Sequence, residues 1–335
     1  MTTTPIGDLA QFIASRTRIA EAQRDLQRSS AEFASGRKSD LGTALRGDFS
    51  RLSTVERGLR LTDTYLAAGG LAAGYFDTMQ RALDTAQSQV VELGPALLSA
   101  SGTGQSKQLL TVATGAEQGF ALTIGAINTQ TGGRSPFAGA ATNALALRPA
   151  PDILADLDTL AAAAPDAATL IADVEAYFMD AGGGYETNAY LGSAAPQTGF
   201  TIGEDETVQT DISALDPALR RTLSGLALGA LMARQVGPTD AASLSEMGQA
   251  AGRWMQEGND ATTDLRAGLG VLEQRVESSL TRNRALETAL GQEQARLVAA
   301  DPFEAATELQ AVETRLESLY LLTSRLSRLS LAEYL

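Results

Sequence analysis

The sequence predicts a mainly α-helical protein, an elongated antiparallel helical rod or coiled coil formed by the N- and C-terminal segments, with a small central α/β insertion domain. Apolar residues near both ends of the chain recur with the three- and four-residue spacing of a coiled coil. Between residues 131 and 215 this periodicity gives way to turn-forming residues. Aromatic residues are only 5% of the chain, which suits thin, closely packed helices better than one large core.

The first helix is predicted over residues 6–35. Its apolar residues recur every seven positions: Phe12, Ile19, Leu26 and Phe33. Gly36 is expected to end this helix in the left-handed conformation that glycine adopts without strain. The polar stretch that follows, up to Gly47, is expected to form a joint.

Asp48 is a suitable N-cap for a second helix, which should run to about Leu93. Gly94 and Pro95 are expected to break it, because proline removes a backbone donor inside a helix. A third helix is predicted over residues 105–128. These helices would form one side of the rod.

The central segment has a different character. Two short alanine-rich helices are predicted, over residues 152–163 and 166–180. The stretch from residue 182 to residue 213 is interpreted as short strands separated by turns, because Phe200 and Ile202 alternate with polar neighbours.

Helix returns at Pro217, with Asp216 as its cap, and is followed by the longest predicted helix, residues 240–300. Asn283 and Glu293 interrupt the apolar seam of that long helix. Single polar residues at such positions can set the register of a coiled coil.

The last helix is predicted to begin at Asp301 and Pro302, which have the chemistry of an N-cap and a first helical position. Its apolar stripe is wider than one partner helix needs. We therefore expect the two terminal helices to be buried in neighbouring copies of the chain. The predicted assembly interface consists of Phe12, Ile19, Leu26, Phe33, Leu309, Val312, Leu316, Leu319, Leu322, Leu326 and Leu329.

The nested order of these helices suggests three regions. Residues 1–47 with 301–335 would form a terminal coiled-coil assembly region. Residues 48–130 with 216–300 would form the helical rod. Residues 131–215 would form the central α/β domain.

The composition argues against several classes of function. A net charge of −14 repels nucleic-acid phosphates and anionic membranes, so neither partner is expected. The chain has no histidine and no cysteine, which removes the commonest catalytic bases, nucleophiles and transition-metal ligands. We expect no enzyme activity, no cofactor and no metal. The N-terminal residues also lack the pattern of a cleaved signal peptide.

Several segments resemble the flagellin family of bacterial flagellar axial proteins. The final stretch, AATELQAVETRLESLYLLTSRLSRLSLAEYL, is similar to the terminal helix of that family. Ala34 to Lys38 resemble its Ser-Gly-basic element after the first helix. Residues 128–139, NTQTGGRSPFAG, together with Tyr190 to Gly192 and residues 201–213, are similar to the outer domain of its hook–filament junction members.

The resemblance implies a structural subunit that self-assembles into a tubular ring in the extracellular flagellum. It implies export by the flagellar type III route with an export chaperone, and contacts with hook-associated protein 1 and with flagellin. Two alternatives remain open. The chain could be flagellin itself, or a coiled-coil adaptor unrelated to flagella.

Overall fold

The computed structural model describes the backbone of residues 6–102 and 106–332, and the side chains of residue 10 and of residues 13–102 and 106–325. This part of the protein is mainly helical with one small antiparallel sheet, as the sequence predicts. The chain divides into a terminal unit, residues 1–61 and 285–335, and a central unit, residues 62–284. These bounds differ from the three predicted regions, because residues 131–215 share one hydrophobic core with the helices that flank them in sequence.

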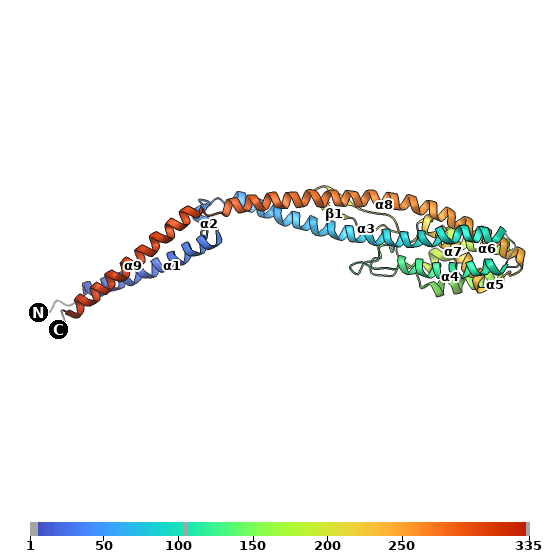
Figure 1. Ribbon diagram of the computed structural model, residues 1–335, viewed down its shortest axis with the longest axis horizontal. Helices are drawn as coiled ribbons and strands as arrows, with labels where there is room; N and C mark the ends of the chain where they lie inside the picture. Colours follow the sequence, from blue (N-terminus) through green and yellow to red (C-terminus); the bar gives the residue numbers. More distant parts are fainter. Residues whose placement is uncertain (1–5, 103–105, 333–335) are drawn as a thin grey trace. The chain divides into compact units, whose positions relative to one another are not determined.

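The terminal unit contains two long helices, α1 (Ile6–Ser35) and α9 (Pro302–Ala332), which run side by side (Figure 1). It also contains the short α2 (Leu41–Ala44), the start of α3 (Ser50–Gly102) and the end of α8 (Ala241–Val298). The bounds of α1 are those that its heptad pattern predicts. The predicted start of α9 is also confirmed, since the Asp301 carboxylate accepts hydrogen bonds from the backbone N–H groups of Phe303 at 2.8 Å and Glu304 at 3.1 Å.

The core of the central unit surrounds α7 (Pro217–Arg234), whose leucines are almost all inaccessible to solvent. Three further helices pack against it: α4 (Ser106–Ile127), α5 (Ala150–Ala163) and α6 (Ala167–Met179). Asp216 caps α7 as predicted, by accepting a hydrogen bond from the Ala218 N–H at 2.9 Å. Residues 185–189, for which a strand was expected, form a π-helical turn, η1 (Tyr185–Ala189).

The predicted break at Gly94 and Pro95 is wrong, because α3 continues through both residues to Gly102. Packing against α8 explains this. A Cβ atom at Gly94 would lie 3.3 Å from the Met255 Cβ atom and 3.5 Å from the Gly252 carbonyl oxygen, so glycine allows a close approach of the two helices. Leu97, one turn further on, is fully buried. Tertiary burial therefore outweighs the local cost of proline.

The sheet is a hairpin of β1 (Phe200–Gly203) and β2 (Glu206–Val208), in which Phe200 pairs with Val208. The hairpin is fastened to α8. The Ile202 carbonyl accepts hydrogen bonds from Ser279 Oγ at 2.7 Å and from Asn283 Nδ2 at 2.9 Å. Asn283 therefore holds the hairpin, whereas the sequence suggested a coiled-coil register position.

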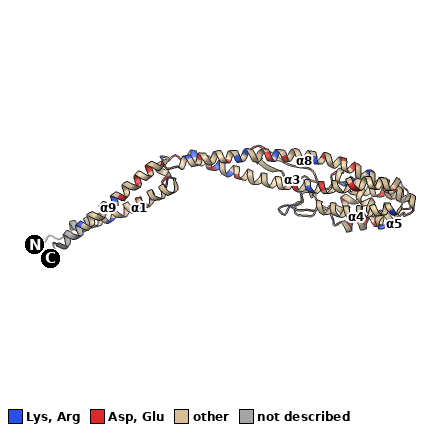
Figure 2. Ribbon diagram, viewed as in Figure 1, with Lys and Arg blue, Asp and Glu red and all other residues tan. Residues whose placement is uncertain are grey.

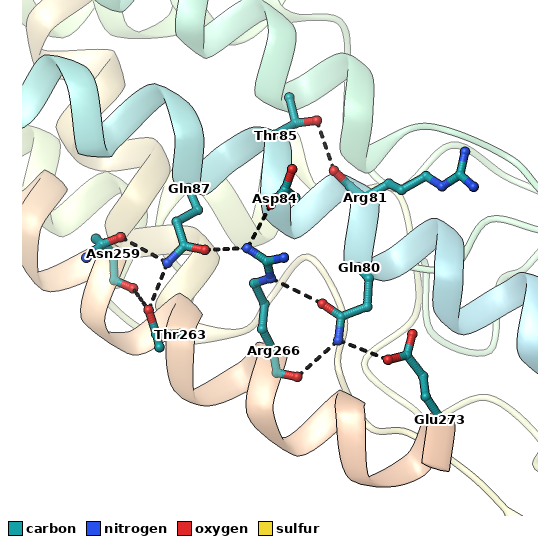
Figure 3. Close-up of polar contacts among 9 residues, drawn as sticks. All are labelled: Gln80, Arg81, Asp84, Thr85, Gln87, Asn259, Thr263, Arg266 and Glu273. Carbon is teal, nitrogen blue, oxygen red and sulfur yellow. Dashed lines mark hydrogen bonds and ion pairs between the residues drawn. The ribbon is translucent and has the colours of Figure 1, made fainter. Parts of the chain in front are cut away.

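Within the central unit, α3 and α8 are joined by polar side chains (Figure 3). Arg266 is the centre of this network. Its guanidinium contacts Gln80 at 3.2 Å, Gln87 at 2.5 Å and Asp84 at 2.9 Å. Gln87 in turn donates to Thr263 at 2.8 Å. Because each of these contacts needs one particular alignment, the network fixes the register of the two helices.

Candidate functional site

The candidate site is the pair of terminal helices, α1 and α9. They bury small side chains between them: Ala22 and Ser29 in α1, and Ala305 and Val312 in α9. In each helix the two residues are seven positions apart and therefore lie on one face. Gln23 donates a hydrogen bond to the Tyr320 hydroxyl at 3.0 Å, which fixes how the two helices align.

A second contact confirms that the helices are antiparallel. Arg28 lies 3.8 Å from Glu308, so a residue later in α1 meets a residue earlier in α9. Arg28 also pairs with Asp25 on its own helix at 3.0 Å. Both ion pairs are largely exposed, so they orient the helices more than they stabilise them.

The predicted interface residues differ in how far this pairing covers them. Val312 is buried in the contact between α1 and α9. Five others are half-buried: Ile19, Leu26, Leu309, Leu316 and Leu319. Phe33 and Leu322 remain 53% and 54% exposed. The side chains of Phe12, Leu326 and Leu329 lie outside the described residues.

The structure adds apolar residues that the heptad pattern did not select. Phe303 and Leu321 are 83% and 66% exposed. They are separated by about five helical turns, and Val312 lies midway between them, about two and a half turns from each. Phe303 and Leu321 therefore lie on the face of α9 that points away from α1. We call these two residues with Leu322 the outer α9 residues. Ile13 of α1 is likewise 55% exposed and lies half a turn out of phase with Ala22.

Burial of these residues would favour association. Full burial of a Leu or Phe side chain contributes roughly 1.5–3 kcal/mol, so an outer α9 residue that is more than half exposed still has about 1–2 kcal/mol to gain. For the three outer α9 residues together this is about 3–6 kcal/mol per subunit, before the entropic cost of association. The sequence analysis had already selected Leu322, and it could have indicated Phe303 and Leu321 only by their large apolar side chains at positions outside the seam.

Two backbone hydrogen bonds, which we call the clasp, join residues 36–38 after α1 to residues 298–300 before α9. The Lys38 N–H donates to the Val298 carbonyl at 2.8 Å, and the Ala300 N–H donates to the Gly36 carbonyl at 2.9 Å. The chain reaches this pairing because Gly36 has a φ of +65°, which favours glycine. The sequence predicted a joint after Gly36 and a helix start at Asp301 as separate features, whereas the structure connects these two segments through the two hydrogen bonds.

Side chains secure the clasp on one side. Glu32 accepts a hydrogen bond from the Ser39 N–H at 2.8 Å. Asp40 accepts from the Thr43 hydroxyl at 2.7 Å and from the Thr43 N–H at 3.1 Å, and these bonds lower the pKa of its carboxyl group. Asp40 therefore stays ionised and caps α2.

The described residues offer no evident site for metal chemistry. Among them, no three or more Asp and Glu side chains are grouped closely enough to hold a metal ion. Figure 2 shows Lys and Arg interspersed with Asp and Glu along α8 and α9. No helix within the described ranges combines the length and the hydropathy that a bilayer span requires.

This chain is similar to known proteins in the sequence of one region and in its fold. Residues 254–335 match the family model of the bacterial flagellin C-terminal helical region. The fold is similar to a solved structure described as a candidate flagellar hook-associated protein from Vibrio parahaemolyticus, with a TM-score of 0.52 and 11% identity. That similarity covers 73% of this chain and 95% of the Vibrio chain. No curated protein matches the sequence.

The family match includes α9, with Val312 and the outer α9 residues, and the second half of α8. At 11% identity, the likeness to the Vibrio structure concerns the fold alone. Residues 254–335 are thus similar to the bacterial flagellin C-terminal helical region, and the fold of the chain resembles that of the Vibrio protein.

Proposed function

We propose that this protein is a structural subunit of the bacterial flagellum at the hook–filament junction, with a role like that of hook-associated protein 3. Copies would assemble into a tubular ring through α1 and α9. In that ring the predicted interface residues and the outer α9 residues are buried between subunits. The ring would contact hook-associated protein 1 on the hook side and flagellin on the filament side.

One observation carries this proposal. A flagellin-type terminal helix pairs with α1 through small residues and leaves Phe303, Leu321 and Leu322 exposed. A helix that served only its own subunit would gain nothing from large apolar groups on its outer face. Leu309, Leu316 and Leu319 are only half-buried within the subunit, which agrees with a helix that becomes further buried on assembly.

The junction position has further support in the sequence. Residues 128–139 are similar to the outer domain of junction proteins, and the structure gives them a defined place in the central core. There Asn128 binds the Leu147 backbone through both amide atoms, each at 2.9 Å, and Phe137 is fully buried. The protein would be exported by the flagellar type III route with a chaperone.

Deletion of residues 303–335 tests the proposal. This deletion removes nearly all of α9 but none of the central core. The truncated chain should fold and stay soluble, yet fail to enter flagella. Cells that produce it in place of the full chain should show hooks without filaments by electron microscopy, with unpolymerised flagellin in the medium. Normal motility of such cells would refute the assembly role.

The family match also favours a second candidate, flagellin itself, because the matched model describes the flagellin C-terminal region. Copy number separates the two candidates. A filament subunit would be the main band of sheared flagella, whereas a junction subunit would be a trace component. An antibody titration against purified protein gives this ratio directly.

A further inference from the structure

The central unit contains a surface groove of about 590 Å³ that the proposed ring contacts do not use. One wall is a face of α8 that includes Leu265, Gly268 and Leu269, and the other is the segment that enters α7, with Ile212 and Pro217. The α8 residues that line the groove recur every three or four positions, so they form one continuous stripe along the helix. Its floor is therefore apolar and regular enough to receive a helical segment.

Gly268 opens the floor of this groove. A Cβ atom there would meet no other atom within 4 Å, so packing within the subunit does not require glycine at this position. Glycine is also disfavoured inside a helix relative to alanine. A side chain at position 268 would instead occupy the space available to a bound segment.

The rim of the groove is acidic. Asp211, Asp216 and Asp264 line it, and the described lining contains no Lys or Arg. Burial, followed by the nearby Asp211 carboxylate, raises the pKa of Asp216, which agrees with a site that lacks a neighbouring cation. A bound cation would relieve the repulsion between these carboxylates.

We propose that this groove is a docking site for an arginine-bearing amphipathic segment of a different protein. The apolar face of the segment would cover the half-buried Ile212, Leu265 and Leu272, and its arginines would pair with the acidic rim. Because the described lining contains three aspartates and neither Lys nor Arg, arginine is the side chain that complements this rim.

The test uses the purified full chain and a fluorescent synthetic peptide of leucine, alanine and arginine, about 14 residues long, which is near the minimum for a helix. Fluorescence anisotropy should show saturable binding. The same peptide with glutamate in place of arginine should not bind. Gly268→Leu should weaken binding at least about tenfold, because its side chain fills the floor, and Asp264→Asn should weaken it roughly threefold.

Two matched controls keep the result interpretable. Gly270→Leu adds the same side chain two positions away, where a Cβ atom also meets nothing and the groove lining is not involved, so binding should not change. Asp205→Asn removes a carboxylate in the β1–β2 turn and should also bind normally. Circular dichroism of each variant establishes that it is folded.

Three results would overturn the proposal. The first is equal binding of the arginine peptide to the wild-type chain and to Gly268→Leu. The second is binding of the glutamate peptide to the wild-type chain with the same affinity as the arginine peptide. The third is a dimer of the chain, seen by sedimentation, that Gly268→Leu abolishes and the arginine peptide does not displace, because the groove would then belong to a second copy.

Discussion

Alanine substitutions at Val312 and Leu321 should have opposite effects on folding and assembly. Val312 is 5% exposed and packs against α1, so Val312→Ala removes two buried carbons and leaves a small cavity. This should destabilise the terminal unit of the isolated chain by about 1.5–2.5 kcal/mol. Leu321 is 66% exposed. Leu321→Ala removes three carbons, whose full burial would contribute about 2.4 kcal/mol. Because only about a third of the side chain is buried in the isolated chain, only about 0.8 kcal/mol of that contribution is present there.

The remaining two thirds of the Leu321 contribution, about 1.6 kcal/mol, should appear only when subunits associate. Since 1.4 kcal/mol corresponds to a factor of ten, each Leu321→Ala subunit should associate more than tenfold more weakly. Hydrogen exchange of α1 and α9 in the isolated chain measures the loss of stability within the subunit. Competition between tagged wild-type and variant chains for incorporation into flagella of the same cells measures the weaker association of subunits.

We expect Val312→Ala to lose protection against hydrogen exchange in the isolated chain, and Leu321→Ala to keep most of that protection but to be strongly depleted from flagella. Leu321→Met, which conserves volume and hydrophobicity, is the control and should incorporate nearly normally. Equal incorporation of Leu321→Ala and wild-type chains would refute the assignment of this face to the assembly. Loss of α9 protection in Leu321→Ala would show that the residue is needed within the subunit instead.

The central unit gives three further predictions. Arg220→Ala should lower the free energy of unfolding by roughly 2–4 kcal/mol, measured by denaturant titration. The substitution leaves Glu186 and the Phe178 and Asp180 carbonyls without their buried partner. A loss below roughly 0.5 kcal/mol, which is the scatter of surface substitutions, would contradict this expectation. Hydrogen bonding and charge from Arg275 and Arg282 lower the pKa of Glu206, so its contribution is complete above the ordinary carboxyl pKa of 4.5 and is lost as the pH falls below that value. The melting temperature of Glu206→Gln should therefore lie below that of the wild type at neutral pH, and the two should converge as the pH falls through the lowered pKa of Glu206. A gap that stays constant with pH would argue against the ion pair. Gly270→Ala should raise the free energy of unfolding by about 0.5–1 kcal/mol, since the added Cβ atom meets no neighbour, and a lower melting temperature would reveal a hidden contact.

The sequence predicts those parts of the fold that depend on local chemistry. Ser35 ends α1 because Gly36 follows it, and Asp216 and Asp301 begin helices because their side chains satisfy free N–H groups. The seam of α9 follows from its heptad spacing, although Val312 alone among the described predicted interface residues is buried by α1. Local rules therefore locate helices well and indicate burial only in part.

The features that the sequence did not reveal depend on distant residues. Pro95 lies within α3 because Gly94 allows Met255 to approach, and the two positions are 161 residues apart. Asn283 binds a hairpin whose position no periodicity encodes. The clasp between residues 36–38 and 298–300 consists of backbone hydrogen bonds, which leave no side-chain pattern. Phe303 and Leu321 were missed because a heptad search selects one face of a helix, whereas Leu322 was among the predicted interface residues.

The outer face of α9 is exposed in the free chain, and in the proposed ring it is buried. The chain contains no cysteine, so Leu321→Cys introduces a single thiol whose reaction with a maleimide reports its exposure. We expect rapid labelling of the purified chain and at least about tenfold slower labelling in flagella isolated from cells that carry the variant, with unfolded protein as the reference rate. Equal labelling rates in the purified chain and in flagella would contradict it.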